Sequence, residues 1–297
     1  MKSEAKAGTE SDLPTSESGV QESRSIDFVP QLPHLPERIV CLTEETVELL
    51  YLLGEQHRIA GISVYVVRPE RARKEKPMVT SFIKGDVEKI KKLNPDLIIG
   101  FSDIQADLAQ ALIKEGLPVW ITNQRSLQQI FETLLQVGAM VGRIQETLGL
   151  LQQWQDKLHS VAARNREKEK IRVFFQEWDE PLIHGIQWVS ELIEICGGIN
   201  CLAEDFDNLD VHKAANRITS VEKVAECQPD TIIGSWCGKP VDFHWIRHQD
   251  GWKETVALQK DLLFEIDSSI ILQPGPALFM EGIDELERYM DRVRDRL

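Results

Sequence analysis

The chain has 297 residues, of which 42% are hydrophobic and 28% are charged, so it can bury sizeable cores and two domains are expected. Its 34 basic and 48 acidic residues give a net charge of −14, which disfavours nucleic-acid binding because phosphate recognition needs a basic surface. The sequence contains no run of 18 apolar residues, so no membrane insertion is predicted.

The first segment, residues 1–36, is rich in Ser, Glu, Gly and Pro and has no apolar core. We interpret it as a disordered tail, because a secretory signal needs a hydrophobic stretch of about 7–15 residues. A cytoplasmic location is expected for the chain as given, and a periplasmic or extracellular one if the true start lies upstream. The five cysteines include no C-x-x-C pair and are interpreted as free thiols: Cys41, Cys196, Cys201, Cys227 and Cys237.

Strands alternate with helices through an expected first lobe, residues 37–142. This order predicts a parallel sheet that is covered on both faces. The expected strands are 38–42, 58–64, 96–100 and 117–121, and the expected helices are 43–54, 84–92 and 104–115.

A long helix is expected to connect this lobe to a second one. Leu151, Trp154, Leu158 and Val161 are spaced as on one helical face. The helix, within 143–170, would act either as a rigid spacer between lobes or as a solvated surface helix of a single domain. The second lobe, 171–297, has expected strands at 172–176, 231–234 and 263–266 and expected helices at 189–196 and 276–294, with a helix–strand unit over 221–234.

One segment occurs twice. Residues 87–100 (VEKIKKLNPDLIIG) and 221–234 (VEKVAECQPDTIIG) share eight of fourteen positions at one offset of 134 residues. Repeat units of solenoid proteins are only about 20–50 residues long. The repeat therefore indicates two similar α/β lobes.

Ligands of parallel sheets bind beyond the carboxyl ends of the strands, and aromatic residues are concentrated there. Such residues suit a large, flat, partly apolar ligand, although each alone could simply pack a core. The aromatic candidates are Tyr65, Phe82, Phe101, Trp178, Trp188 and Trp236. Polar candidates, which the sequence does not rank, are Asp103, Asn123, Gln124, Gln176, Glu177, Asp179, His184, Asp267 and Ser268.

Signatures of catalysis are missing: the chain has no Walker A motif, no G-x-G-x-x-G after a strand, no G-x-S-x-G and no H-E-x-x-H. This favours a binding protein without catalytic residues, resident metal or cofactor. An alternative is an intracellular metal-binding protein or enzyme that uses His244 and His248, spaced i and i+4, or the cysteines.

The motifs Arg-Ile-Val-x-Leu-Thr, Asn-Pro-Asp-Leu-Ile-Ile-Gly and Glu-Ile-Cys-Gly-Gly resemble those of cobalamin-binding substrate-binding proteins of ABC importers. These belong to the class that also binds siderophores and haem, and the resemblance covers about residues 37–297. It implies two Rossmann-like α/β lobes with parallel sheets, joined by one long helix, with the ligand in a cleft between them and little hinge motion.

The resemblance also implies a site. Tyr65, Phe82 and Phe101 match aromatic residues of the family's corrin pocket, and Glu88 and Glu222 match glutamates that dock on the transporter's membrane subunits. We therefore expect a monomer that binds cobalamin or another corrinoid without a strong protein–cobalt bond. The expected ligand-binding set is Tyr65, Phe82, Phe101, Trp178, His184, Trp188, Trp236 and Asp267.

An alternative ligand on the same fold is haem or a ferric siderophore. Cationic side chains would favour such an anionic iron chelate. Only Arg68, Arg125 and Lys239 stand at the expected strand ends, so this alternative ranks second.

Overall fold

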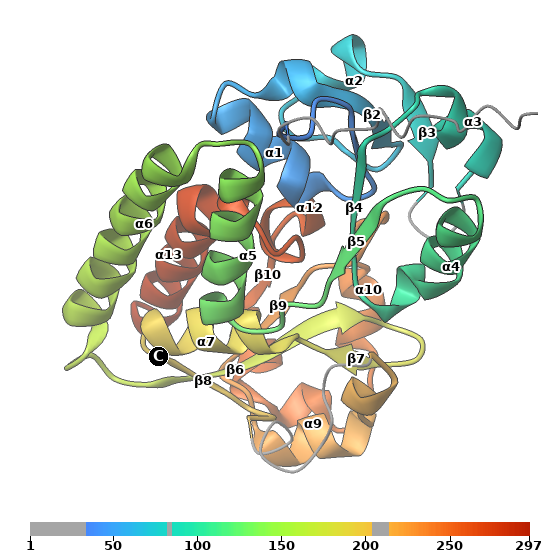
Figure 1. The fold of residues 1–297 in the computed structure, drawn as a ribbon. Coiled ribbons are helices and arrows are strands. Elements are labelled where there is room, and N and C mark those ends of the chain that lie inside the picture. Colours follow the sequence, from blue (N-terminus) through green and yellow to red (C-terminus); the bar gives the residue numbers. More distant parts are fainter. Residues whose placement is uncertain (1–33, 82–84, 204–213) are drawn as a thin grey trace, which may run out of the picture. The chain divides into compact units, whose positions relative to one another are not determined.

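The computed structural model describes residues 34–81, 85–203 and 214–297. The expected tail therefore lies outside the described residues except for its last three. Two five-stranded sheets organise the described chain (Figure 1). None of the described helices is long and apolar enough to cross a membrane.

Sheet A is entirely parallel, with strand order β3-β2-β1-β4-β5. Its strands are β1 (Ile39–Cys41), β2 (Ile59–Ser63), β3 (Met78–Thr80), β4 (Leu97–Phe101) and β5 (Val119–Thr122). The helices of this lobe are α1 (Glu44–Leu52), η1 (Gln56–Arg58), α2 (Ala72–Glu75), α3 (Val87–Lys92), η2 (Asp103–Gln105), α4 (Ala106–Lys114) and α5 (Leu127–Met140).

Sheet B has the order β10-β9-β6-β7, and β8 also pairs with β6. Its strands are β6 (Ile171–Trp178), β7 (Ile183–His184), β8 (Gly198–Asn200), β9 (Thr231–Gly234) and β10 (Leu263–Glu265). Because β7 runs antiparallel to β6, this sheet is mixed and not wholly parallel as predicted. Its helices are α7 (Gln187–Ile195), η3 (Ala214–Arg217), α9 (Val221–Cys227), α10 (Phe243–Arg247), η4 (Trp252–Glu254), α11 (Val256–Gln259), α12 (Ser268–Ile271), the π-helical turn η5 (Leu278–Gly282) and α13 (Ile283–Arg294).

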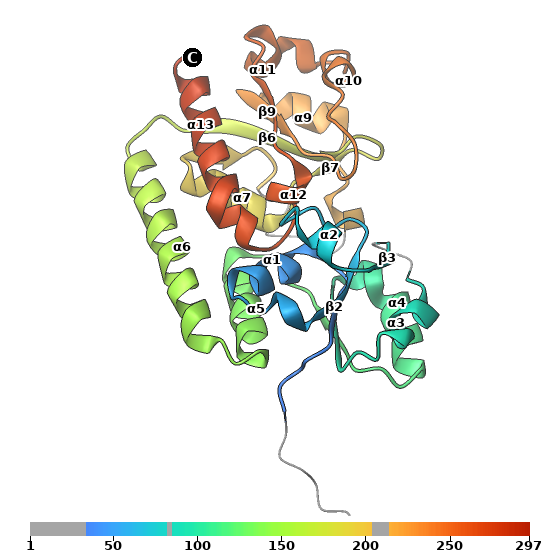
Figure 2. The ribbon, with the colours of Figure 1, turned by 90° about the horizontal axis from the view of Figure 1, so that it is seen from above.

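The predicted long helix is α6, Ile144–Asn165. It lies beside α13 (Figure 2). Ion pairs join the two helices, among them Lys157 with Asp284 and Arg164 with Glu287, both at 2.7 Å. The C-terminal half of the helix that connects the lobes is therefore held to the last helix of the second lobe.

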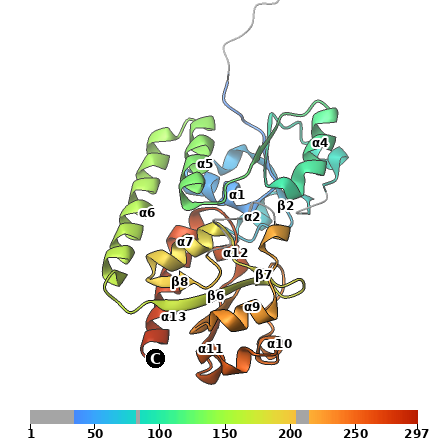
Figure 3. The same cartoon turned by 90° about the horizontal axis from the view of Figure 1, so that it is seen from below.

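One hydrophobic cluster, which we call the central core, takes residues from both sheets. In β6, Val173 and Phe175 belong to the central core, whereas Phe174 belongs to a second cluster. This second cluster lies under α9, α10 and α11, which stand together on one side of β6 (Figure 3). This alternation is what a strand covered on both faces requires. Sheet A does the same: Ile99 enters the central core and Ile98 packs under α3 and α4.

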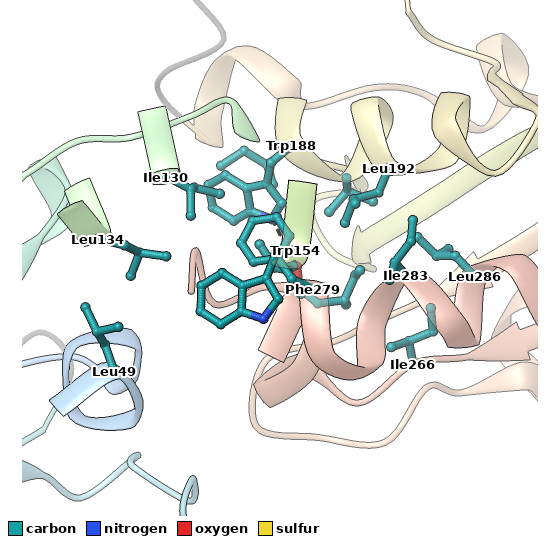
Figure 4. Packing of buried hydrophobic residues seen from close by; sticks show 14 of the residues in the cluster. Leu49, Ile130, Leu134, Trp154, Trp188, Leu192, Ile266, Phe279, Ile283 and Leu286 are labelled. Atoms are coloured by element: carbon teal, nitrogen blue, oxygen red, sulfur yellow. Dashed lines mark hydrogen bonds between the residues drawn. The ribbon is translucent and has the colours of Figure 1, made fainter. Parts of the chain in front are cut away.

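Helices α1, α5, α6, α7 and α13 fill the central core between the sheets (Figure 4). Phe279 of η5 is fully buried there. Its ring stacks on Trp154 of α6 at 5.3 Å and meets Phe131 of α5 edge-on at 4.9 Å. The two lobes thus share one apolar interior, and the predicted bilobal α/β fold is confirmed with this addition.

The repeated segment has the same structure in both lobes. It forms α3 and β4 in the first lobe and α9 and β9 in the second, and each strand pairs with the central strand of its sheet. Asp96 accepts a backbone hydrogen bond from Arg38 at 2.9 Å, and Asp230 accepts one from Arg172 at 2.7 Å. The aspartate of each copy therefore fixes the start of the neighbouring strand.

Candidate functional site

The carboxyl ends of sheet A meet the second lobe at α7. The ring of Phe101, the last residue of β4, lies 6.3 Å from that of Trp188 in the first turn of α7. The backbone N–H of Leu127, which follows β5, donates to Glu191 of α7 at 2.7 Å. The strand ends of the first lobe are thus in direct contact with the second lobe.

A second set of contacts joins α1 to the segment before α13. The backbone N–H of Ala277 donates to Glu48 at 3.0 Å, and Arg68 pairs with both Glu48 and Glu281. A Cβ atom on Gly275 would lie 2.5 Å from that of Glu45, so only glycine permits this approach of the two lobes.

Buried acidic groups follow the central strand β1. Burial raises the pKa of the Glu44 carboxyl to about 8 and that of Glu45 to about 7. Thr43 donates to Glu45 Oε1 at 2.6 Å, while the other carboxylate oxygen of Glu45 is buried without a hydrogen-bond partner among the described residues.

Neutral polar groups without partners gather at the same strand ends. Both side-chain amide atoms of Gln124 and of Gln176 are buried and make no hydrogen bond within the described chain, and the same holds for Ser235 Oγ and Trp236 Nε1. Gln124 follows β5, Gln176 lies near the end of β6, and Ser235 follows β9 and donates its N–H to the carbonyl of Gln176 at 2.9 Å. A buried polar group normally has a partner, so these groups are candidates for contact with a ligand.

Trp178 and Trp236 of the second lobe both lie close to one lysine. Lys239 Nζ is 4.3 Å from the ring centre of Trp178 and 4.7 Å from that of Trp236, and it pairs with Asp179 at 2.7 Å. The Trp236 side chain also belongs to the core under α10, where it meets Trp245. These two aromatic residues, both predicted ligand contacts, are therefore close together, and the Lys239 ammonium group contacts both rings.

His184, one of the polar candidates, lies in β7, where it is buried. Its carbonyl accepts a hydrogen bond from Arg217 at 2.7 Å. Arg217 also forms a two-fold ion pair with Glu177. Sequence reasoning missed Arg217, because the residues around it carry no strand or helix signal.

The other predicted aromatic and acidic residues differ in exposure. Tyr65, after β2, is 57% exposed, whereas Phe101 is 8% and Trp188 1% exposed. Trp188 belongs to the central core and donates its ring N–H to the carbonyl of Ile271. It therefore packs behind Phe101 and does not point into open space. Asp267 is exposed and caps α12. Phe82 lies outside the described residues.

Backbone strain occurs at the end of β4. Ser102 has φ 76° and ψ 161°, a conformation that side-chain-bearing residues rarely adopt and that is enriched at binding sites. Its N–H donates to Thr122 of β5 at 2.7 Å. A hollow of about 670 Å³ adjoins it, lined by Asp103, Asn123 and residues of α4.

The predicted docking residues take equivalent places. Glu88 and Glu222 are both exposed in the first turns of α3 and α9. The proposed metal-binding histidines are His244 and His248, whose rings stack at 4.1 Å, and His248 Nδ1 lies 2.7 Å from the carbonyl of His244. The described residues contain no cluster of three or more metal-ligating side chains.

Comparison with known proteins adds sequence relatives. The periplasmic binding protein family matches residues 39–270. The vitamin B12-binding protein of Vibrio parahaemolyticus is 25% identical over 264 residues, which cover 88% of this chain and 92% of the relative. The uncharacterized ABC transporter substrate-binding lipoprotein YvrC of Bacillus subtilis is 21% identical over 261 residues, covering 84% and 79%.

Solved structures share the fold. The periplasmic vitamin B12 binding protein BtuF of Vibrio cholerae superposes with a TM-score of 0.68 at 23% identity, covering 88% of this chain and 99% of that one. The periplasmic heme-binding protein RhuT from Roseiflexus sp. RS-1 gives 0.71 at 22% identity, covering 86% and 99%. The paired sheets, the connecting helix and the match over most of the sequence lead to one conclusion: the chain belongs to the periplasmic binding protein family.

Proposed function

We propose that this protein binds cobalamin or a related corrinoid at the strand ends where its two lobes meet. The observation that carries the proposal is the set of buried, neutral polar groups without partners on both sheets, namely Gln124, Gln176 and Ser235. A corrin ring carries amide side chains around its rim. Amides and hydroxyls can both donate and accept hydrogen bonds, so these groups suit such a rim.

Aromatic residues would supply the apolar contact area. Tyr65 offers the most exposed ring, and Phe101, Trp178 and Trp236 stand at the ends of β4, β6 and β9. His184 and Asp267 are proposed as polar neighbours, and Phe82 as a further aromatic contact. Trp188 is proposed to act indirectly, because its nearly complete burial leaves it to hold Phe101 in position.

The second candidate ligand is haem or a ferric siderophore, which the likeness to a heme-binding protein favours. The charges of the site argue against it. Each strand-end cation already has an acidic partner: Arg68 has Glu48 and Glu281, Arg125 has Asp103, and Lys239 has Asp179. An anionic ligand would have to displace these partners, and it would leave the neutral amides unpaired.

Calorimetry with hydroxocobalamin, haemin and a ferric catecholate chelate tests the ligand. We expect saturable binding of hydroxocobalamin at about micromolar or lower concentration and weak or no binding of the other two. Saturable haemin binding without hydroxocobalamin binding would reject the corrinoid proposal and favour the second candidate. Absence of binding by all three would reject both.

We further propose that Glu88 and Glu222 dock the protein on the membrane subunits of an ABC importer. Support comes from their exposure and from their equivalent positions in the two copies of the repeat. Each stands at the start of a helix that leads into the next parallel strand, so its first turn lies toward the carboxyl edge of the sheet, where the ligand is proposed to bind. The family name and the lipoprotein among the relatives support a location outside the cytoplasm, in place of the cytoplasmic location expected from the sequence.

Docking is tested by ligand-dependent stimulation of the importer's ATPase in proteoliposomes. Replacing both Glu88 and Glu222 by Gln should abolish the stimulation while leaving hydroxocobalamin affinity unchanged. Glu167→Gln, an equally exposed site beyond the end of α6, is the matched control. Full stimulation by the double variant would reject the docking role.

A further inference from the structure

Two cysteine thiols lie side by side in the second lobe. Cys201 follows β8, and Cys227 is the last residue of α9. The thiol of Cys227 donates to the carbonyl of Cys201 at 3.1 Å, and the two thiol groups are within hydrogen-bonding reach of each other. Residues that are 26 positions apart in sequence are thus adjacent in space.

The backbone holds both cysteines against neighbouring residues of one strand. The N–H of Cys201 donates to the carbonyl of Val173 at 2.9 Å. The carbonyl of Cys227 accepts from Arg172 Nε at 2.8 Å. Arg172 is in turn fixed by Asp230, which starts the turn into β9. The proximity of the thiols therefore depends on the core of sheet B and not on a surface loop.

The pair is not equipped to hold a metal ion. Within the described ranges no third His, Cys, Asp or Glu completes a cluster around it. Both side chains are instead partly buried against the apolar cluster under α9, α10 and α11. The other cysteines are separate: Cys41 and Cys196 lie in the central core, and Cys237 is exposed.

We propose that Cys201 and Cys227 are a disulfide-forming pair that closes when the protein meets an oxidising disulfide. One thiolate attacks the disulfide of the oxidant and releases one thiol, and the second thiolate then displaces the other. The two cysteines lose two hydrogens and two electrons, and the oxidant, a small-molecule or protein disulfide, becomes two thiols. The step needs nothing else.

The disulfide would link the two ends of the segment 201–227, which contains Arg217. This arginine lies between the two cysteines in sequence and binds Glu177 and the carbonyl of His184 at the end of β6. Closing the loop restricts the unfolded chain, and it also limits how far Arg217 can move from β6. The inference does not depend on which ligand the protein binds.

Treatment of the purified full chain with oxidised glutathione tests the proposal. The hydrogen bond to Cys227, together with burial, raises the pKa of the Cys201 thiol, so the reaction should be run at about pH 8.5 to supply thiolate. We expect the thiols titrated after denaturation to fall from five to three. We also expect a mass loss of two hydrogens, a linked peptide that contains Cys201 and Cys227, and a melting temperature that rises by several degrees and reverts with dithiothreitol.

The variants Cys201→Ala and Cys227→Ala should each abolish the stabilisation by oxidation, and Cys237→Ser, at an exposed site, should keep it. Five remaining thiols would overturn the proposal, as would glutathione adducts without a linked peptide. A linkage that involves Cys237 would also overturn it. Using two different single variants ensures that a folding defect in one of them does not decide the result.

Discussion

A buried amide without a partner destabilises a folded protein by about 1 to 3 kcal/mol, and Gln176 is such a residue. Methionine has nearly the same shape and no strong hydrogen-bonding group. We predict that Gln176→Met raises the melting temperature of the unliganded protein. It should also weaken hydroxocobalamin binding by about fivefold, because one lost hydrogen bond is worth about 1 kcal/mol. Thermal melts and calorimetry measure the two effects.

The matched control is Gln152→Met on α6, where the glutamine is exposed and bonds to Asp156. It should leave hydroxocobalamin affinity unchanged and should not raise the melting temperature. A Gln176→Met variant with unchanged affinity would remove Gln176 from the site.

Glu44 and Glu45 make stability depend on pH. Their carboxyls titrate with pKa values of about 8 and about 7 in the folded protein, against an ordinary value of 4.5, so between about pH 5 and pH 8 the folded state holds more protons than the unfolded state. The free energy of unfolding therefore falls as pH rises through this window, by at most about 1.4 kcal/mol per pH step of one for each carboxyl. Above the window, both states are ionised and the dependence ends.

Melting temperatures at pH 5, 6, 7 and 8 check this prediction. The decline should be shallower in Glu45→Gln, which removes one titrating group, and unchanged in the surface variant Glu167→Gln. Carboxyls whose pKa is lowered, such as that of Glu55, titrate at pH values below this window. They therefore do not change the free energy of unfolding within it. A melting temperature that increases from pH 5 to pH 8 would contradict the burial of these groups.

Gly234, the last residue of β9 in the second copy of the repeat, packs closely against a neighbouring side chain. A Cβ atom here would lie 2.7 Å from both methyl groups of Val241, a β-branched side chain with little freedom to turn away. We predict that Gly234→Ala lowers the free energy of unfolding by about 1 to 3 kcal/mol. Urea denaturation measures the change.

Gly149→Ala is the counterpart within α6. No atom lies within 4 Å of a Cβ placed there, and alanine favours a helix over glycine by about 1 kcal/mol. This variant should therefore be stabilised by about that amount. If both substitutions changed the free energy of unfolding equally, the close contact between Gly234 and Val241 would not determine stability at that position.

Elements with strong local patterns were predictable, and those defined by contacts were not. The repeat, β1, β4 and α6 followed from apolar runs and spacing. Helix α5 was missed although Ser126 and Gln129 form a capping box, because Gly138 weakens its helical pattern. A Cβ on Gly138 would clash with Thr147 Oγ1, so the glycine allows α5 and α6 to pack closely, which the sequence alone does not reveal.

The candidate site was predictable only as a region. The carboxyl-end rule placed Gln124 and Gln176 among the candidates, but only the structure distinguishes an amide without a partner from one that has a partner. Trp188 shows the converse: it stands near a strand end, yet its side chain turns into the central core. Sequence position gives the end of a strand, and packing decides which way a side chain points.

The whole molecule, over residues 35–297, forms one compact unit with an interior shared by both sheets. We predict a single cooperative unfolding transition instead of one for each lobe. The variant Phe279→Ala removes a ring that packs against both Trp154 and Phe131. It should lower the free energy of unfolding by about 3 to 5 kcal/mol and still unfold in one transition.

Calorimetry with circular dichroism in the near and far ultraviolet tests this prediction. Coincident transitions and equal calorimetric and van't Hoff enthalpies are expected for the wild type and for Phe279→Ala. Two separated transitions would mean that the lobes fold independently. The expected monomeric state stays a prediction that the same samples can test by sedimentation.

Because the segment is repeated, the surface carries two equivalent exposed glutamates, one in each lobe. Glu88 and Glu222 present the same charge on the same kind of helix start, once in each lobe. A partner that carries two identical receptor sites can engage both at once, and the second contact then forms at a high effective concentration. In the docking that we propose, two weak contacts would together give a firm but releasable association, and the loss of either glutamate would remove this gain from avidity.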